Sequence, residues 1–179
     1  MANIFFASDH HFHHANILTF KRQDGTPLRE FDDVNHMNEH MVNCHNSVVK
    51  PHDKVYFVGD VSMHTTIEAL EILRRMNGQK VLIKGNHDLA KPGRYMEHFK
   101  DVRGSHQFDG MILTHIPIHT ESLARWGLNV HGHLHHNVVR MPLAQIPDKR
   151  YFNVSMERIN YTPISLEEVK KNVRVSNPG

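Results

Sequence analysis

Five polar clusters, each rich in Asp, Asn or His, follow directly after short apolar runs of this chain. The apolar runs have the length of strands, and the glycines and small polar residues of the clusters are typical of loops. In an α/β sheet, the loops after the strands gather at one edge, where ligands bind. We therefore expect the clusters to converge. They are SDHH at 8–11, GDVSMH at 59–64, GNHD at 85–88, THIPI at 114–118 and HGHLH at 131–135.

The intervals between the clusters predict the fold in outline. Apolar residues recur at steps of three and four over 34–48, the period of a helix with one buried face. Capping-box spacings at Thr65 with Glu68, and at Ser165 with Glu168, predict the starts of two further helices, the last one ending near Val173. We expect a short helix over 95–99 and strands over 3–7, 54–58, 81–83, 111–113, 128–130 and 151–154.

Length and composition restrict the class of protein. With 179 residues, 39% of them hydrophobic, we expect one globular domain over 1–179, with a frayed tail at 175–179. Cys44 is the only cysteine, which excludes an internal disulfide and a thiolate metal cluster. The net charge of +2 is spread along the chain, so we expect no polymeric nucleic acid as partner. Neither a signal peptide nor a membrane-spanning run is present, so we expect a cytoplasmic location and no membrane partner.

The donor types in the clusters indicate metal chemistry. Carboxylate and carboxamide oxygens with imidazole nitrogens suit Mn²⁺, Fe and Zn²⁺ better than Ca²⁺ or copper. The clusters offer seven such donors, more than one ion needs, and an Asp can bridge two cations through its two oxygens. Two ions about 3.5 to 4 Å apart clamp a phosphoryl group and activate a water between them. The pattern therefore predicts hydrolysis of a phosphate ester.

The motifs resemble one known family in type and order. DxH at 9–11, GD at 59–60, GNHD at 85–88, the lone His115 and GHxH at 132–135 are similar to the motifs of the calcineurin-like metallophosphoesterases. The stretch DHHFHHANI at 9–17 resembles the first motif of a small bacterial and phage-type subgroup. The resemblance implies an α/β fold, a four-layer α-β-β-α sandwich of two mixed sheets.

The resemblance also implies a role for each matching residue. His87 would contact the substrate phosphate and protonate the leaving oxygen as general acid, with Asp88 orienting it, while a metal-bridging hydroxide attacks in line. The cofactors would be two divalent ions, with Mn²⁺ as first choice and Fe, Zn²⁺ or Ni²⁺ as alternatives. The implied ligands are Asp9, His11 and His135 for the first metal and Asn86, His115 and His133 for the second, with Asp60 bridging them.

Other positions differ from the family pattern or stand outside it. Met63 and His64 occupy the place where many relatives have a second Asp, and the interval from His11 to Gly59 leaves room for a lid that selects the substrate. Arg22 is a candidate to bind a phosphate oxygen. Of the remaining histidines, we interpret His131 as structural or as a support of the ligands. His36, His40, His45 and His52 are interpreted as solvated.

The predicted activity is hydrolysis of a phosphomonoester or phosphodiester in a small nucleotide-like substrate. Two alternatives stay open: a catalytically silent binding scaffold on the same fold, and a nuclease that acts on polymeric DNA or RNA. The presence of His87 and of all seven donors argues against the scaffold, and the dispersed positive charge argues against the nuclease. A His-rich storage protein would need no catalytic histidine beside its ligands. The sequence predicts no oligomeric state.

Overall fold

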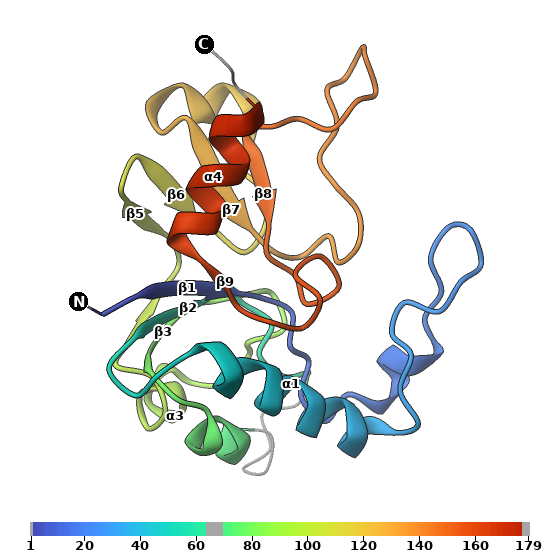
Figure 1. Ribbon diagram of the computed structural model, residues 1–179, viewed down its shortest axis with the longest axis vertical. Coiled ribbons are helices and arrows are strands. Elements are labelled where there is room, and N and C mark those ends of the chain that lie inside the picture. The colour runs from blue at the N-terminus through green and yellow to red at the C-terminus, as the bar shows by residue number, and fades with distance from the viewer. Residues whose placement is uncertain (1, 64–69, 177–179) are drawn as a thin grey trace.

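A computed structural model describes residues 2–63 and 70–176 of the chain. Two mixed β-sheets lie against each other, with helices on either side of the pair (Figure 1), so the predicted fold class is confirmed. His64, the expected capping box at Thr65 and Glu68, and the end of the tail lie outside the described residues. Within 2–63 and 70–176, no helix combines the length and the apolar character that a membrane crossing requires.

The first sheet has five strands in the order β4-β3-β2-β1-β9. The pairs β1–β2, β2–β3 and β3–β4 are parallel, and β9 is antiparallel to β1. Its first three strands in the chain therefore end at one edge, as the loop pattern predicted. The strands are β1 (Ile4–Ala7), β2 (Lys54–Phe57), β3 (Gln79–Ile83), β4 (Asp101–Arg103) and β9 (Ile164–Ser165).

The second sheet has four strands in the order β5-β6-β7-β8. β5 is antiparallel to β6, whereas β6, β7 and β8 run parallel. The strands are β5 (His106–Phe108), β6 (Met111–Leu113), β7 (Leu128–His131) and β8 (Tyr151–Asn153). The strands β4, β5 and β9 were not predicted, because two or three residues are too few to show a period.

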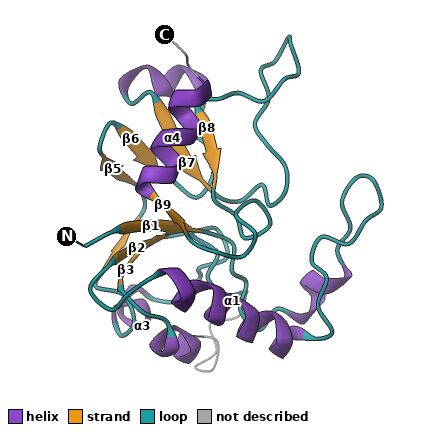
Figure 2. Cartoon of the chain, in the orientation of Figure 1, coloured by secondary structure: helices purple, strands orange, loops and turns teal. Residues whose placement is uncertain are grey.

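The alternation of side chains along β1 divides the core into two parts. Phe5 points to the outer cluster, which contains Met37 and Met41 of helix α1 (Val34–Val48), whereas Phe6 points to the cluster between the sheets. Each buried side chain of this size contributes about 1.5 to 3 kcal/mol to folding. The remaining helices are η1 (Ala15–Thr19), η2 (Ile72–Arg75), α3 (Pro92–Met96), η3 (Thr120–Arg125) and α4 (Leu166–Ser176), and Figure 2 shows the long loops between them.

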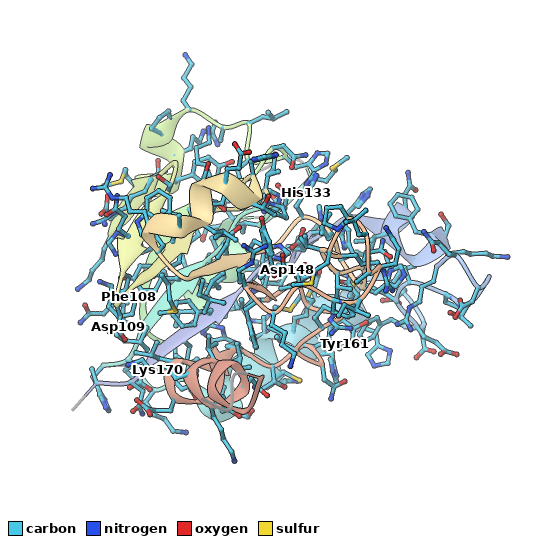
Figure 3. The ribbon with its side chains drawn as sticks, turned by 90° about the horizontal axis from the view of Figure 1, so that it is seen from above. Phe108, Asp109, His133, Asp148, Tyr161 and Lys170 are labelled. Atoms are coloured by element: carbon cyan, nitrogen blue, oxygen red, sulfur yellow. The ribbon has the colours of Figure 1, made fainter. Side chains whose placement is uncertain are left out.

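The last helix begins where its capping box predicts. The backbone N–H of Ser165 donates to the Glu168 carboxylate (3.0 Å), and the N–H of Glu168 donates to Oγ of Ser165 (3.2 Å). The helix runs to Ser176, past its expected end near Val173. An ion pair of 2.5 Å between Lys170 and Asp109, both labelled in Figure 3, ties it to the turn between β5 and β6.

Two expectations about local structure were wrong. The short helix α3 begins at Pro92 rather than near Tyr95, because proline is favoured in the first helical turn. His45 is buried on α1 rather than solvated, and its Nε2 lies 2.9 Å from the carbonyl oxygen of Asn77. The α1 pattern was interpreted from apolar residues only, so a histidine on the buried face was missed.

Candidate metal centre

The polar clusters meet beyond the carboxyl ends of the parallel strands, as expected. Asp9 and His11 follow β1, Asp60 follows β2, His115 follows β6 and His133 follows β7. Their side chains form two groups, and within each group the candidate ligand atoms lie within 4.8 Å of one another. The groups are Asp9, His11 and His135, and Asp60, His115 and His133. The four histidines are divided as the resemblance implied, and Asp60, the implied bridge, falls in the second group.

The two groups adjoin each other through Asp60. Nε2 of His11 lies 3.8 Å from Oδ1 of Asp9 and 3.8 Å from Oδ2 of Asp60. The same Oδ2 lies 3.1 Å from Nε2 of His115. The Asp60 carboxylate therefore stands between both groups, where a bridging ligand would have to be. Oδ1 of Asn86 lies 3.1 Å from Nε2 of His115, which places the predicted amide ligand in the second group.

The backbone that presents these side chains is in an unusual conformation. Positive φ angles of 50° to 68° occur at five of the seven predicted ligands, although each costs about 1 kcal/mol or more outside glycine. Strain of this kind persists only where the surroundings enforce it. Two loop-to-loop bonds do so here, from the N–H of Asp9 to Gly59 O (3.0 Å) and from the N–H of His11 to Asp60 O (3.1 Å). The five strained ligands are Asp9, His11, Asp60, His133 and His135.

Two motif glycines allow the loops to pack this closely. A Cβ atom at Gly85 would lie 2.5 Å from the backbone nitrogen of Asp60 and would collide with its carboxylate. A Cβ atom at Gly132 would collide with Oγ of Ser8 and with the Asp9 carboxylate. The glycines of GNHD and GHxH therefore leave space for the two carboxylates, in addition to forming turns.

The donor set fits two divalent cations. Both ring nitrogens of His11 are buried, and neither has a hydrogen-bond partner among the described residues. Nδ1 of His115 lies 2.8 Å from the Val58 carbonyl oxygen, so Nδ1 carries a proton, and Nε2, which faces Asp60, is the nitrogen that a metal could bind in place of a proton. Oxygen and nitrogen donors on buried loops, with orphaned imidazole nitrogens among them, are what a metal centre of intermediate hardness requires.

Electrostatics favours positive charge at this position. Burial opposes protonation of His115, but the hydrogen bond to Asp60 and the carboxylate charges outweigh it and raise the pKa of His115 to about 9. Burial alone would raise the pKa of the Asp60 carboxyl. The hydrogen bond and the charge of His115, together with the hydrogen bond from the His87 backbone N–H, outweigh burial and lower the pKa of Asp60 below its usual value. A metal cation would gain from the same pair of carboxylates that attracts the proton.

The two predicted catalytic residues, His87 and Asp88, differ in burial and in what they contact. The His87 ring is half-buried at the edge of the centre, with its centroid 5.7 Å from that of the His11 ring, and its backbone N–H donates to Oδ1 of Asp60 (2.9 Å). Asp88 is buried, and its carboxylate accepts backbone N–H groups of Asp60, Val61 and Gly85 at 2.8 to 3.0 Å. Its described hydrogen bonds hold the loops rather than the His87 ring.

Three supporting residues were missed from the sequence. Oε1 of the buried Glu157 carboxylate accepts hydrogen bonds from Nδ1 of His135 (3.0 Å) and from Nε of Arg29 (2.7 Å). Arg29 also donates to the backbone carbonyls of Asp9 and His10. Ser155 Oγ donates to Oδ2 of Asp9 (2.8 Å). Ser155 and Glu157 follow strand β8, so the rule that located the other clusters could have found them.

Two cavities near the ligands are lined by the sequence neighbours of Arg22, the predicted phosphate-binding residue. One cavity next to the centre is lined by His133 and His135 together with Lys21, and a second one beyond it includes Gln23. Arg22 lines neither of these two cavities.

His131, interpreted as structural, is buried, and its Nδ1 lies 2.8 Å from the Gly132 carbonyl oxygen.

Comparisons with known proteins identify relatives of the whole chain. The uncharacterized protein MJ1445 of Methanocaldococcus jannaschii is 35% identical over 175 residues, which cover 96% of this chain and 91% of MJ1445. The chain belongs to the same family as MJ1445. Gene 66 protein of Mycobacterium phage L5 is 28% identical over 171 residues, with coverage of 75% of this chain and 78% of the phage protein. No protein-family model matches the chain.

A solved structure shares the fold. The protein of unknown function AQ665 from Aquifex aeolicus superposes with a TM-score of 0.72 and 25% sequence identity, covering 96% of this chain and 99% of AQ665. The two-sheet arrangement is therefore that of an experimentally determined structure over nearly its full length. Proteins similar to this chain therefore occur in Methanocaldococcus jannaschii, in Aquifex aeolicus and in a mycobacteriophage.

Proposed function

We propose that the protein is a dinuclear-metal phosphoesterase that hydrolyses a phosphodiester or phosphomonoester in a small nucleotide-like substrate. The observation that carries the proposal is the Asp60 carboxylate, which lies 3.8 Å from His11 of one candidate group and 3.1 Å from His115 of the other. Two separate metal sites would not need a shared carboxylate. Two divalent cations, when bound, polarise the phosphoryl oxygens and supply a nucleophilic water near neutral pH.

The residues of the chain would perform the remaining steps. Asp9, His11 and His135 would hold one cation, and Asn86, His115 and His133 the other, with Asp60 between them. The half-buried His87 is at the edge of the centre, where an imidazolium can donate its proton to the leaving oxygen and offset developing charge. Asp88 would keep His87 in place indirectly, through the loop that it binds.

The choice of metal follows from the donor set. Four imidazoles, two carboxylates and one carboxamide favour Mn²⁺, with Fe, Zn²⁺ and Ni²⁺ as alternatives. Assays of the purified protein with each ion, using p-nitrophenyl phosphate and bis-p-nitrophenyl phosphate, test the proposal directly. We expect hydrolysis with at least one ion and a stoichiometry of two metals per chain.

Two variants separate metal binding from proton transfer. His87→Ala should retain both metals and lose about 100-fold or more in kcat, because general acid catalysis is worth roughly that much. Asp60→Asn should lose metal. His36→Ala, a substitution of an exposed histidine on α1, is the matched control and should behave as the wild type. Full activity of His87→Ala would exclude the acid role, and failure of every ion and ester would favour the scaffold alternative.

A further inference from the structure

Two long loops near the metal centre contribute residues to a groove. In Figure 1 the blue loop after η1 and the orange loop after β7 project from the same side of the molecule. A cavity of about 440 Å³ beside the ligands shares the lining residues His136 and Asn137 with a second cavity of about 620 Å³, so the two adjoin. The first is lined by Phe20, Lys21, Leu28 and 133–137, and the second by Gln23, 136–138, Arg140, Pro147 and Arg158.

The cations of this groove lack acidic partners. Lys21 and Arg158 form no side-chain hydrogen bond or ion pair with the described residues, and Arg140 donates only to the Gln145 backbone carbonyl (2.6 Å). No Asp or Glu is among the described residues that line the two cavities. By contrast, five other arginines are paired with carboxylates at 2.6 to 2.7 Å: Arg29, Arg74, Arg75, Arg103 and Arg150.

An exposed aromatic ring stands at the inner end of the groove. All nine phenylalanines lie in the described residues, and Phe20, with 46% of its surface accessible, is the only exposed one. It lines the same cavity as His133 and His135. Nucleotide bases bind aromatic side chains by stacking, and guanidinium groups bind phosphate in bidentate fashion. An aromatic ring followed by unpaired cations is therefore suited to a nucleotide with a terminal phosphate.

We propose that the groove recognises a dinucleotide with a 5′-terminal phosphate, stacking a base on Phe20 and holding that phosphate with Lys21, Arg140 and Arg158. The inference rests on the proposed function, because the internal phosphodiester is the bond that the metal centre would hydrolyse. Water adds to phosphorus, one bridging P–O bond breaks, and the leaving oxygen takes the proton of His87. From pApA the products are two molecules of AMP, or adenosine 3′,5′-bisphosphate and adenosine.

The matched substrates pApA and ApA test the phosphate subsite, because they contain the same ester and differ only in the terminal phosphate. We expect the wild type to prefer pApA by about 10-fold or more in kcat/KM. The variant Arg140→Gln/Arg158→Gln should reduce this ratio to near one. Arg94→Gln, which removes an exposed arginine of α3 outside the groove, should keep the wild-type ratio. A wild type without preference, or a double variant that keeps it, would overturn the proposal.

The stacking role has its own variant pair. Phe20→Trp should leave KM for pApA close to the wild-type value, whereas Phe20→Leu, which is apolar but cannot stack, should raise it about 10-fold. Equal KM values for the two variants would refute a stacked base.

Calorimetry with pApA and ApA, using the metal-loaded His87→Ala variant, measures the groove without turnover. The proposal is supported if this variant binds pApA more tightly than ApA and the difference disappears when Arg140→Gln and Arg158→Gln are added. Equal binding of pApA and ApA contradicts it. The outcome is separable from the proposed function: cleavage of bis-p-nitrophenyl phosphate without a preference for pApA rejects only the groove. Absence of all hydrolysis rejects the enzyme, while calorimetry still decides whether the groove binds the terminal phosphate.

Discussion

Nδ1 of His135 lies 3.0 Å from Oε1 of Glu157, and this oxygen also accepts a 2.7 Å bond from Arg29. The carboxylate therefore fixes the imidazole with its Nε2 lone pair free, which is the arrangement that supports metal-binding histidines in many proteins. The charge of Arg29, together with the bond to His135, lowers the pKa of Glu157 to about 2 in spite of its burial. Arg29 and His135 together thus keep the Glu157 carboxylate ionised.

Glu157→Gln should weaken binding of the metal held by His135. We expect a loss of about 10- to 100-fold in metal affinity, because the neutral glutamine amide is a weaker acceptor than the carboxylate for the hydrogen bonds from His135 and Arg29. Isothermal titration with Mn²⁺ measures the effect at each of the two sites. Glu167→Gln, at an exposed position of α4, is the control and should titrate as the wild type. Unchanged affinity at both sites would show that the Glu157 contact is merely structural.

Asp88 gives a prediction that separates two roles. Because its carboxylate accepts three backbone N–H groups, Asp88→Ala leaves those donors buried without partners, at a cost of about 3 kcal/mol or more. We expect lower stability in urea unfolding and weaker metal binding near Asp60. If Asp88 instead oriented the His87 ring, kcat would fall while metal content stayed complete. Asp101→Ala, at an exposed ion pair, serves as the control.

The sequence-derived expectations were most successful where polar residues follow a buried strand. Asp60 and Asn86 could be placed because β2 and β3 are apolar runs that end abruptly. Arg29 and Glu157 are 128 residues apart and belong to no motif, so their contact depends on tertiary structure. The groove could not be predicted either. Lys21 is more than a hundred positions from Arg140 and Arg158, so these cations come together only in the folded chain.

Gly132 should tolerate no side chain. The methyl group of Gly132→Ala would overlap Ser8 and the Asp9 carboxylate, so we expect weaker metal binding and a stability loss of about 1 to 3 kcal/mol. Metal content and the thermal unfolding midpoint measure the two effects. Gly104→Ala introduces the same methyl group where no atom lies within 4 Å, so it should change neither. Normal metal content of Gly132→Ala would argue against the tight loop packing.

His45 makes the stability depend on pH. Burial lowers its pKa from 6.5 to about 4, an effect that the bond to the Asn77 carbonyl only partly offsets, so the folded protein holds this imidazole neutral. The unfolded chain binds a proton below pH 6.5 and the folded chain does not. The free energy of unfolding should therefore fall as the pH decreases from 6.5 to 4, by about 3 kcal/mol from this residue.

Urea unfolding at pH 7 and at pH 4.5 measures this dependence for the wild type and for His45→Gln. Glutamine can still donate to the Asn77 carbonyl but does not titrate, so the difference between the two pH values should be smaller in the variant. His36→Gln removes an exposed histidine of the same helix and should leave the wild-type difference unchanged. The same pH dependence in wild type and His45→Gln would mean that His45 is protonated as readily in the folded protein as in the unfolded chain.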